Sequence, residues 1–360
     1  MPDTVCPTIP DAPLVFTMGD ACGIGPEILV QTWAQCQPRG WVNGSVSVLQ
    51  RAADTLRQRR PESAASLPEV VALVSPEGWF KLSPGQMGVW QPDGLPDDLM
   101  LAPIGQVDRR AGIAAAACIR AAVRQAQCGL AAGIVTAPLH KEALALAGES
   151  YPGHTELLQA EGAPPGQPPA PVRMMLMNDQ LKTVLVTIHV GLRQAIDQVS
   201  FEAVLETIQI THRSARLWGL THPRIAVAGL NPHAGEGGLF GDEEIRIIAP
   251  AIEAARQQGI DAQGPFAPDT VFMRARHAPP AHPGEFDVVI AMYHDQGLIP
   301  VKYMGLDHGV NVTLGLPFVR TSPDHGTAFD LAGTGRADPA SLIEATRVAQ
   351  ILIRGAHPQV

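Results

Sequence analysis

Short runs of β-branched and aliphatic residues alternate along this chain with longer segments of helical character. The apolar runs lie at residues 14–16, 133–135, 183–189, 225–230 and 288–292. Helices are predicted from Pro26 onward and over residues 108–127, 201–218 and 243–258. Apolar strands without an alternating polar face are typical of parallel sheets, which are covered by helices on both faces. The pattern therefore predicts an α/β fold.

Two proline-rich segments interrupt this alternation, at residues 162–171 (GAPPGQPPAP) and 277–284 (HAPPAHPG). Proline has no backbone N–H and a fixed φ, which excludes the first segment from a helix or a central strand. Each segment is predicted to be a linker or an ordinary surface loop.

Composition narrows the classes of function. The 360 residues include 26 Lys and Arg against 35 Asp and Glu, a formal charge of −9, which argues against binding to nucleic acid. No apolar run is long enough for a membrane span, and residues 1–13 lack the features of a secretory signal, so we expect a cytoplasmic protein. The five cysteines are scattered without a C-x-x-C pair, which fits neither a disulfide framework nor a cysteine zinc site.

Three of the apolar runs lead directly into a histidine. KTVLVTIH ends at His189, RIAVAGLNPH at His233 and FDVVIAMYH at His294. Ligands bind beyond the carboxyl ends of the strands in open α/β sheets, so these histidines are predicted to converge on a metal site. The alternative is that each histidine is an ordinary hydrogen-bonded residue near the core.

Candidate anion-binding residues follow these histidines. Lys302, Asn311 and Arg320 are spaced along a largely apolar stretch. Arg and Lys near one crevice would complement a phosphate or a carboxylate, whereas the ordinary alternative is a solvated pair. No G-x-G-x-x-G, P-loop or H-E-x-x-H motif occurs. The residues by themselves thus indicate a metal-dependent α/β enzyme acting on a small anion.

A family resemblance is carried by six segments in a fixed order. These are TMGDACGIGPEI (17–28), TAPLHKEAL (136–144), YPGHTELL (151–158), GLNPHAGEGGLFGDEE (229–244), AMYHDQGLIPVKYMG (291–305) and GVNVTLGLPFVRTSPDHGTAFDLAGTGRAD (309–338). Together they resemble the 4-hydroxythreonine-4-phosphate dehydrogenase family of vitamin B6 biosynthesis. The last segment is also similar to a strip of isopropylmalate and isocitrate dehydrogenases, which bind NAD without the usual glycine fingerprint. The chain differs from the usual family segments at Met18, Ala21, Cys22 and His140.

The resemblance implies a three-layer α/β/α fold like that of isocitrate and isopropylmalate dehydrogenases, with two subdomains and a cleft between them. We expect residues 1–135 with 307–360 to form the subdomain that binds NAD adenosine. Residues 136–306 would carry the metal histidines and the dimer interface. It also implies a homodimer whose active site lies at the subunit interface.

The implied reaction is the NAD- or NADP-dependent oxidation of 4-phosphooxy-L-threonine to 2-amino-3-oxo-4-phosphooxybutanoate. The product then loses carbon dioxide to give 3-amino-2-oxopropyl phosphate, in pyridoxal 5'-phosphate biosynthesis. Related enzymes that oxidise phosphothreonate or phosphoerythronate share most of these motifs and remain the alternative.

The resemblance also assigns roles to individual residues. His189, His233 and His294 match ligands of a divalent metal such as zinc, magnesium or cobalt. Substrate contacts match at His154, Thr155, Lys302, Asn311 and Arg320. The strip that would bind the adenosine half of NAD or NADP includes His325, Gly326, Asp330 and Asp338. Proton transfer needs a side chain near the reacting oxygen, for which the candidates are Lys302, Asp295 and Lys141.

Overall fold

The computed structural model describes residues 13–151, 153–164, 166–305 and 309–356. The chain folds into two compact units. Unit 1 comprises residues 1–170 and 316–354, and unit 2 comprises residues 171–315 and 355–360. These boundaries differ from the expected division after residue 135 and before residue 307. Residues 136–170 belong with unit 1, where the helices they form pack against the preceding long helix.

Unit 1 contains a parallel sheet and its covering helices. Its strands are β1 (Leu14–Thr17), β2 (Gly40–Asn43), β3 (Glu69–Ala72), β4 (Gln86–Trp90), β5 (Gly133–Thr136) and β14 (Val319–Pro323). They are ordered β3-β4-β2-β1-β5-β14, and all of these pairs are parallel. Its helices are α1 (Gly25–Cys36), α2 (Val46–Arg59), α3 (Arg109–Gln127), α4 (Lys141–Leu146), α5 (His154–Glu161) and most of α11 (Ala340–Ala356).

The helices of unit 1 begin where the sequence supplies suitable residues. The Asp108 side chain accepts a hydrogen bond from the backbone N–H of Arg110 and so caps α3, which confirms the helix predicted there. The alanine-rich face of α3 packs against β1, β2 and β5. Buried Val15, Trp41 and Ile134 belong to the core cluster under this helix.

Unit 2 contains a mixed sheet. Its strands are β6 (Arg173–Met177), β7 (Lys182–Leu185), β8 (Ile225–Ala228), β9 (Ala262–Phe266), β12 (Val288–Ala291) and β13 (Val310–Leu314), with β10 (His277–Ala278) and β11 (His282–Pro283) in a separate hairpin. The order is β13-β6-β7-β12-β8-β9, in which β6 is antiparallel to both neighbours and the other pairs are parallel. The helices are α6 (Leu192–Gln198), α7 (Phe201–Ser214), α8 (Ala249–Gln257), α9 (Val271–Ala275) and α10 (His294–Tyr303).

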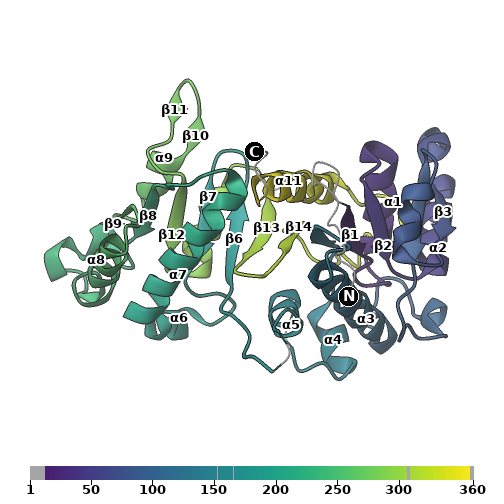
Figure 1. Ribbon diagram of the computed structural model, residues 1–360, viewed down its shortest axis with the longest axis horizontal. Helices are drawn as coiled ribbons and strands as arrows, with labels where there is room; N and C mark the ends of the chain where they lie inside the picture. Colours follow the sequence, from purple (N-terminus) through teal and green to yellow (C-terminus); the bar gives the residue numbers. More distant parts are fainter. Residues whose placement is uncertain (1–12, 152, 165, 306–308, 357–360) are drawn as a thin grey trace, which may run out of the picture. The chain divides into compact units, whose positions relative to one another are not determined.

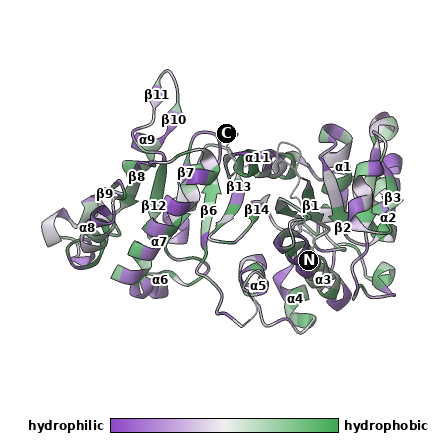
Figure 2. Cartoon of the chain, in the orientation of Figure 1, coloured by the Kyte–Doolittle hydropathy of each residue, from purple (hydrophilic) through white to green (hydrophobic). Residues whose placement is uncertain are grey.

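The hydropathy of unit 2 follows this arrangement, as Figure 2 shows for the hydrophobic strand β12 and the mixed surface of helix α7. All four residues of β12 are buried. The helix α10 packs on β7 and β12, where a Cβ on Gly297 would lie 2.4 Å from a Leu185 methyl carbon. This glycine therefore allows the helix to approach the strands closely. The predicted α/β class is confirmed.

Three predicted elements differ in extent from the observed ones. The strand predicted over residues 183–189 ends at Leu185, and the backbone turns into the left-handed region at His189, with φ 47°. The helix predicted over residues 201–218 continues after α7 as a short 3-10 turn, Ala215–Trp218. The helix predicted over residues 243–258 begins as a π turn, η7 (Glu244–Ile248), before α8.

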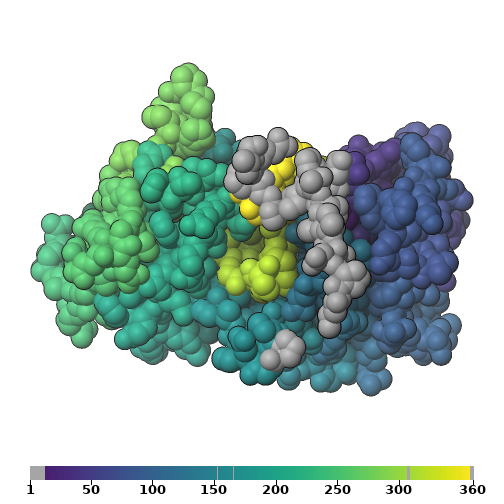
Figure 3. Space-filling view, viewed as in Figure 1, coloured from purple at the N-terminus to yellow at the C-terminus, as the bar shows by residue number. Residues whose placement is uncertain are grey.

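The two proline-rich segments have different structures. Residues 162–171 form turns and irregular backbone where described, and the chain passes from unit 1 to unit 2 within them. Residues 277–284 form the β10–β11 hairpin, which projects from unit 2 (Figures 1 and 3). The loop predicted there is thus corrected to a hairpin, because proline is tolerated in an exposed two-stranded ribbon. An ion pair at 2.7 Å between Arg274 and Glu285 closes its base.

Candidate active site

The three histidines predicted to bind metal follow three neighbouring strands of unit 2. β7, β12 and β8 are adjacent and parallel, so their carboxyl ends share one edge of the sheet. His189 follows β7, His233 follows β8, and His294 is the first residue of α10 after β12. The strand-end pattern therefore places all three residues on the same edge.

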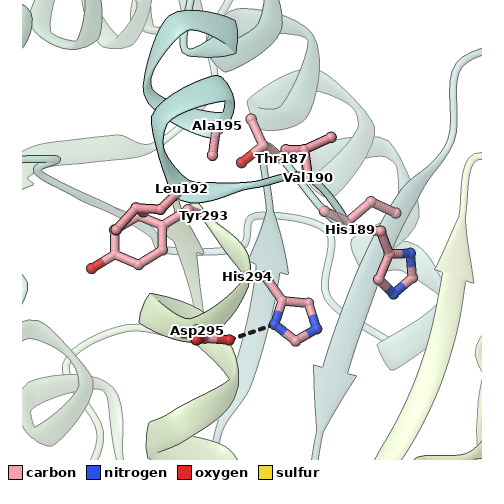
Figure 4. A pocket seen from close by; sticks show the side chains of 9 residues that line it. Thr187, His189, Val190, Leu192, Ala195, Tyr293, His294 and Asp295 are labelled. Atoms are coloured by element: carbon pink, nitrogen blue, oxygen red, sulfur yellow. Dashed lines mark hydrogen bonds and ion pairs between the residues drawn. The ribbon is translucent and has the colours of Figure 1, made fainter.

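His189 and His294 lie side by side at this edge. Their ring centroids are 5.7 Å apart, and both residues line a cavity of about 230 Å³ with Thr187, Leu192 and Tyr293 among its walls (Figure 4). Nδ1 of His294 is 2.7 Å from the Asp295 carboxylate. An imidazole that donates its Nδ1–H to a carboxylate presents the Nε2 lone pair to a metal. The pair therefore has the donor chemistry of a metal site.

His233 lies on a strained loop, η6 (Pro232–Gly238). Residues 233–237 all have positive φ, with values of 52°, 53°, 79°, 42° and 67°. The left-handed region is costly for residues with a Cβ, and such strain is concentrated at functional sites. His189 shares this conformation. Two of the three predicted ligands are thus held in backbone that the surrounding structure must impose.

The side chain of Glu244 anchors the start of this loop. It is 3% exposed, and its Oε1 accepts hydrogen bonds from the backbone N–H groups of Leu230 and Asn231, both at 2.7 Å. The Asn231 amide also donates to the Glu243 and Glu244 carboxylates. Sequence reasoning missed this role. The signal in the sequence was the GDEE run (241–244), which follows the loop.

Gln296 connects two strand ends of the same edge. Its Oε1 accepts from the backbone N–H of Met292, and its Nε2 donates to the carbonyl of Gly229, at 2.6 and 2.8 Å. The side chain is buried. Gln296 therefore fixes the start of α10, and with it His294, relative to the end of β8.

The structure brings two of the three predicted metal ligands together. The ring of His233 lies against Phe240, with centroids 6.2 Å apart. Among the described residues, no group of three or more His, Cys, Asp or Glu side chains is close enough to hold a metal ion. The His189–His294 pair thus fits a metal as two of its ligands, and His233 lies on the loop that follows the adjacent strand.

A second polar cluster lies in unit 1. Arg320 on β14 is 2% exposed and donates a 2.7 Å hydrogen bond from Nη2 to the Thr136 hydroxyl at the end of β5. Burial lowers the pKa of Arg320 to about 10, and nearby Glu156 favours its charged form. The guanidinium is therefore charged at neutral pH. Thr136 was not predicted as a site residue.

His154 faces this arginine from the start of α5. Its Nε2 is buried and has no hydrogen-bond partner among the residues that the structure describes. Burial and the Arg320 charge hold the pKa of His154 well below its usual range, so the ring is neutral at pH 7. Thr155 is the next residue of α5 and is half-buried. A buried cation beside a neutral ring nitrogen lacking a partner is suited to an anionic ligand.

The remaining predicted substrate and acid–base residues lie on several elements. Lys302 is in the last turn of α10, and Asn311 is on β13. The side-chain amide oxygen Oδ1 of Asn311 is buried and has no hydrogen-bond partner within the described part of the chain. Asp295 is engaged with His294, and Lys141 is exposed at the start of α4.

The predicted cofactor strip lies between β14 and α11. His325 is half-buried, and Gly326 and Asp330 are exposed. The Asp338 carboxylate accepts a hydrogen bond from the Ala340 N–H at 2.9 Å, which places it at the start of α11. The Glu27 carboxylate of α1 accepts from the backbone N–H groups of Gly333 and Gly335. The strip is thereby fastened to the first turn of α1.

The described helices include none that is both long and apolar enough to cross a membrane.

Comparisons with known proteins agree with the sequence resemblance. The model of the family "Pyridoxal phosphate biosynthetic protein PdxA" matches residues 36–349. The chain is 52% identical over 334 residues to 4-hydroxythreonine-4-phosphate dehydrogenase from Beijerinckia indica, covering 92% of each protein. It is 42% identical to D-threonate 4-phosphate dehydrogenase from Pectobacterium atrosepticum, covering 94% of this chain and 98% of that one.

A solved structure agrees as well. The crystal structure of 4-hydroxythreonine-4-phosphate dehydrogenase from Klebsiella pneumoniae superposes with a TM-score of 0.82 at 41% identity. The match covers 95% of this chain and 98% of that one.

Proposed function

Because the chain belongs to the family of pyridoxal phosphate biosynthetic protein PdxA, we propose that it oxidises 4-phosphooxy-L-threonine at its C3 hydroxyl with NAD or NADP. The product is 2-amino-3-oxo-4-phosphooxybutanoate. Its carboxylate is β to a ketone, so it loses carbon dioxide to give 3-amino-2-oxopropyl phosphate. The observation that carries this substrate class is the buried Arg320 beside His154.

Arg320 would bind the substrate phosphate. A guanidinium forms paired, charge-assisted hydrogen bonds to phosphate oxygens, and these are strong where water is excluded. His154 would donate from its buried Nε2, since a neutral imidazole can carry its proton on that nitrogen. Thr155, Lys302 and Asn311 are proposed to complete the substrate contacts.

His189, His294 and His233 are proposed to hold a divalent metal. Bound there, the metal would lower the pKa of the substrate hydroxyl as hydride leaves for the nicotinamide ring. An all-imidazole donor set suits zinc or cobalt better than magnesium, which prefers oxygen ligands. Asp295 keeps the His294 ring oriented through its 2.7 Å contact with Nδ1.

Of Lys302 and Asp295, Lys302 is the better acid–base candidate. Asp295 already bonds to Nδ1 of His294, whereas the Lys302 side chain can accept a proton near the reacting oxygen as an amine and return it as an ammonium. His325, Gly326, Asp330 and Asp338 are proposed to line the adenosine site of the dinucleotide. Support comes from the two Glu27 hydrogen bonds that fix this strip.

A homodimer is proposed as the active form. Large apolar side chains are exposed on unit 2, including Met273 at 70%, Ile299 at 63% and Tyr303 at 91%. Met273 and Tyr303 line the same pocket of unit 2, and contiguous exposed apolar groups are typical of a protein interface. Light scattering beside activity over a dilution series tests this, and a fully active monomer would contradict it.

The reaction is tested with purified protein, a divalent metal and NAD or NADP. Reduced nicotinamide, followed by its absorbance, should form with 4-phosphooxy-L-threonine. D-Threonate 4-phosphate is the second candidate substrate, because relatives with that name are 42% identical to this chain. A larger kcat/KM for the threonate would favour the second candidate, and no reduction with either substrate would refute both.

A further inference from the structure

Four loops of unit 1 meet near the carboxyl ends of β1 and β5. The backbone N–H of Asp20 donates to the Pro138 carbonyl at 2.8 Å, and the N–H of Gly105 donates to the Cys22 carbonyl at 2.8 Å. The N–H of Ile24 donates to the carbonyl of Thr327 at 3.0 Å. Segments far apart in the sequence are thus joined through their backbones.

Glycines allow this close approach. Gly19 has φ +71°, and a Cβ there would lie 2.3 Å from the Pro138 carbonyl oxygen. A Cβ on Gly23 would lie 2.9 Å from Cβ of Thr327. A side chain therefore fits at neither position. The polar groups at this junction of the four loops come from the other residues of the loops.

Asp20 is the most deeply buried of these. It is 1% exposed, and its Oδ1 accepts a 2.8 Å hydrogen bond from the backbone N–H of Cys22. Its Oδ2 is buried and lacks a hydrogen-bond partner among the described residues. Burial raises the pKa of Asp20 to about 6, a shift opposed by His140 and increased by Asp108. Asp20 is therefore a carboxylate at neutral pH with one buried acceptor unused.

A flat pair of rings lies beside this carboxylate. The imidazole of His140 stacks on Phe329, with centroids 4.9 Å apart and an interplanar angle of 15°. Nδ1 of His140 is also buried without a hydrogen-bond partner in the described part of the chain. Phe329 belongs to the strip proposed to bind the dinucleotide, and both rings are half-buried. Flat, partly exposed rings favour a planar ligand.

The junction thus combines an unused acceptor with a planar apolar surface. A ligand that satisfies both is a flat heteroaromatic ring bearing an exocyclic NH₂ group. Resting on the proposed dinucleotide dependence, we propose that Asp20 Oδ2 accepts a hydrogen bond from an exocyclic NH₂ of a dinucleotide base packed beside the His140–Phe329 pair. The NH₂ is either that of the nicotinamide carboxamide or that of adenine, which share this chemistry.

Binding of NAD analogues to the metal-loaded protein tests the proposal, with affinity measured by calorimetry. In 3-acetylpyridine adenine dinucleotide a methyl group replaces the carboxamide NH₂. In nicotinamide hypoxanthine dinucleotide an oxygen replaces the adenine NH₂. One of the two analogues should bind the wild type roughly tenfold to a hundredfold more weakly than NAD, as expected for a lost hydrogen bond to a buried charge.

The variant Asp20→Asn identifies the partner of that NH₂. It should weaken NAD binding by a similar factor and should bind NAD and the affected analogue about equally. Asp97→Asn, a change of an exposed carboxylate in the same unit, is the matched control and should behave as wild type. Near-ultraviolet circular dichroism of each variant verifies the fold. The analogue that is affected assigns the base as nicotinamide or adenine.

Two results would overturn the proposal. Both analogues binding the wild type as tightly as NAD would show that no exocyclic NH₂ is recognised. An analogue penalty that persists unchanged in Asp20→Asn would show that another group recognises it. If the wild type binds neither NAD nor NADP, the proposed dinucleotide dependence itself has failed, which is a distinct result.

Discussion

The polar residues at the candidate sites of the two units differ in how far they are exposed to solvent. In unit 2 the side chains of His294 and Asp295 are 37% and 73% exposed, and the strain lies in the backbone of the adjoining loops. In unit 1 the side chains of Arg320 and Asp20 are 2% and 1% exposed, and the energetic cost lies in the desolvation of charge.

The two units therefore illustrate two ways in which a protein can arrange a binding site before its ligand is bound. Accessible imidazoles keep their lone pairs for a ligand, and a strained backbone fixes their direction. Buried charges interact strongly with a ligand because water does not screen them, but they carry shifted pKa values while the site is empty. Substitutions in unit 2 should therefore change ligand binding with little change in stability, whereas substitutions in unit 1 should change both.

The largest expected effect is that of His294→Ala. Loss of a metal ligand should lower kcat/KM by more than about a thousandfold, since a Lewis acid contributes several kcal/mol. Because the side chain is partly exposed, the free energy of unfolding measured with a chelator should change by only about 0.5 kcal/mol. Metal content per protomer is measured in parallel. Unchanged occupancy and activity would remove His294 from the ligand set.

Arg320→Ala should have the next largest effect. Losing a charge-assisted contact to phosphate in a dry site should lower kcat/KM by roughly 30-fold to 1000-fold. A phosphate held away from the reacting carbon also positions that carbon, so kcat should fall as well as KM rise. Arg320→Lys should recover only part of the activity, because lysine lacks the paired donors of a guanidinium.

The non-phosphorylated substrate is the control for Arg320. Wild type and Arg320→Ala should use it about equally poorly. An equal loss on both substrates would assign Arg320 to the substrate carboxylate or to the fold.

The strand-end histidines were predictable from the sequence because each apolar run dictates a strand and parallel strands share an edge. The left-handed loop at His233 was not predictable, since its conformation depends on Glu244 reaching back from the next helix. The hairpin at residues 277–284 was missed for a similar reason. Its proline content excludes a central strand but does not exclude an exposed ribbon.

The polar cluster of unit 1 was less predictable from the residues themselves. His154 was assigned by family resemblance alone. Arg320 was also a candidate from its place in a largely apolar stretch, but nothing in the local sequence indicates that it is buried against Thr136. Asp20 and His140 lie in different segments and meet only through the packing of loops around Gly19 and Gly23. Long-range packing of this kind sets desolvation, and desolvation cannot be inferred from residue types alone.

Asp295→Asn should have a smaller effect than the loss of a metal ligand. Asparagine keeps the shape but removes the charge that orients the His294 ring, so metal affinity should fall by roughly tenfold to a hundredfold. Excess metal should restore activity in this variant but not in His294→Ala. Titration with cobalt, followed by its visible absorbance, measures both. An unchanged affinity would show that the 2.7 Å contact does not support metal binding.

The most specific expected effect leaves activity aside and concerns the stability of unit 1 and the charge on Asp20. The folded-state pKa of about 6 is above the ordinary aspartate value of 3.8, so folding favours the protonated acid. This group therefore destabilises the fold above about pH 6, and the destabilisation disappears as the pH falls toward about 4. Each pKa unit corresponds to about 1.4 kcal/mol, so the wild type should lose about 2–3 kcal/mol relative to Asp20→Asn between about pH 4 and pH 7. At roughly 2–4 °C per kcal/mol, the difference in Tm between the two proteins should change by several degrees over this range. The neighbouring His140 and Asp108 titrate in both proteins, so their contributions largely cancel in the comparison. A difference in Tm that does not vary with pH would mean that Asp20 is ionised without cost, and the contrast drawn between the two units would then not hold at this residue.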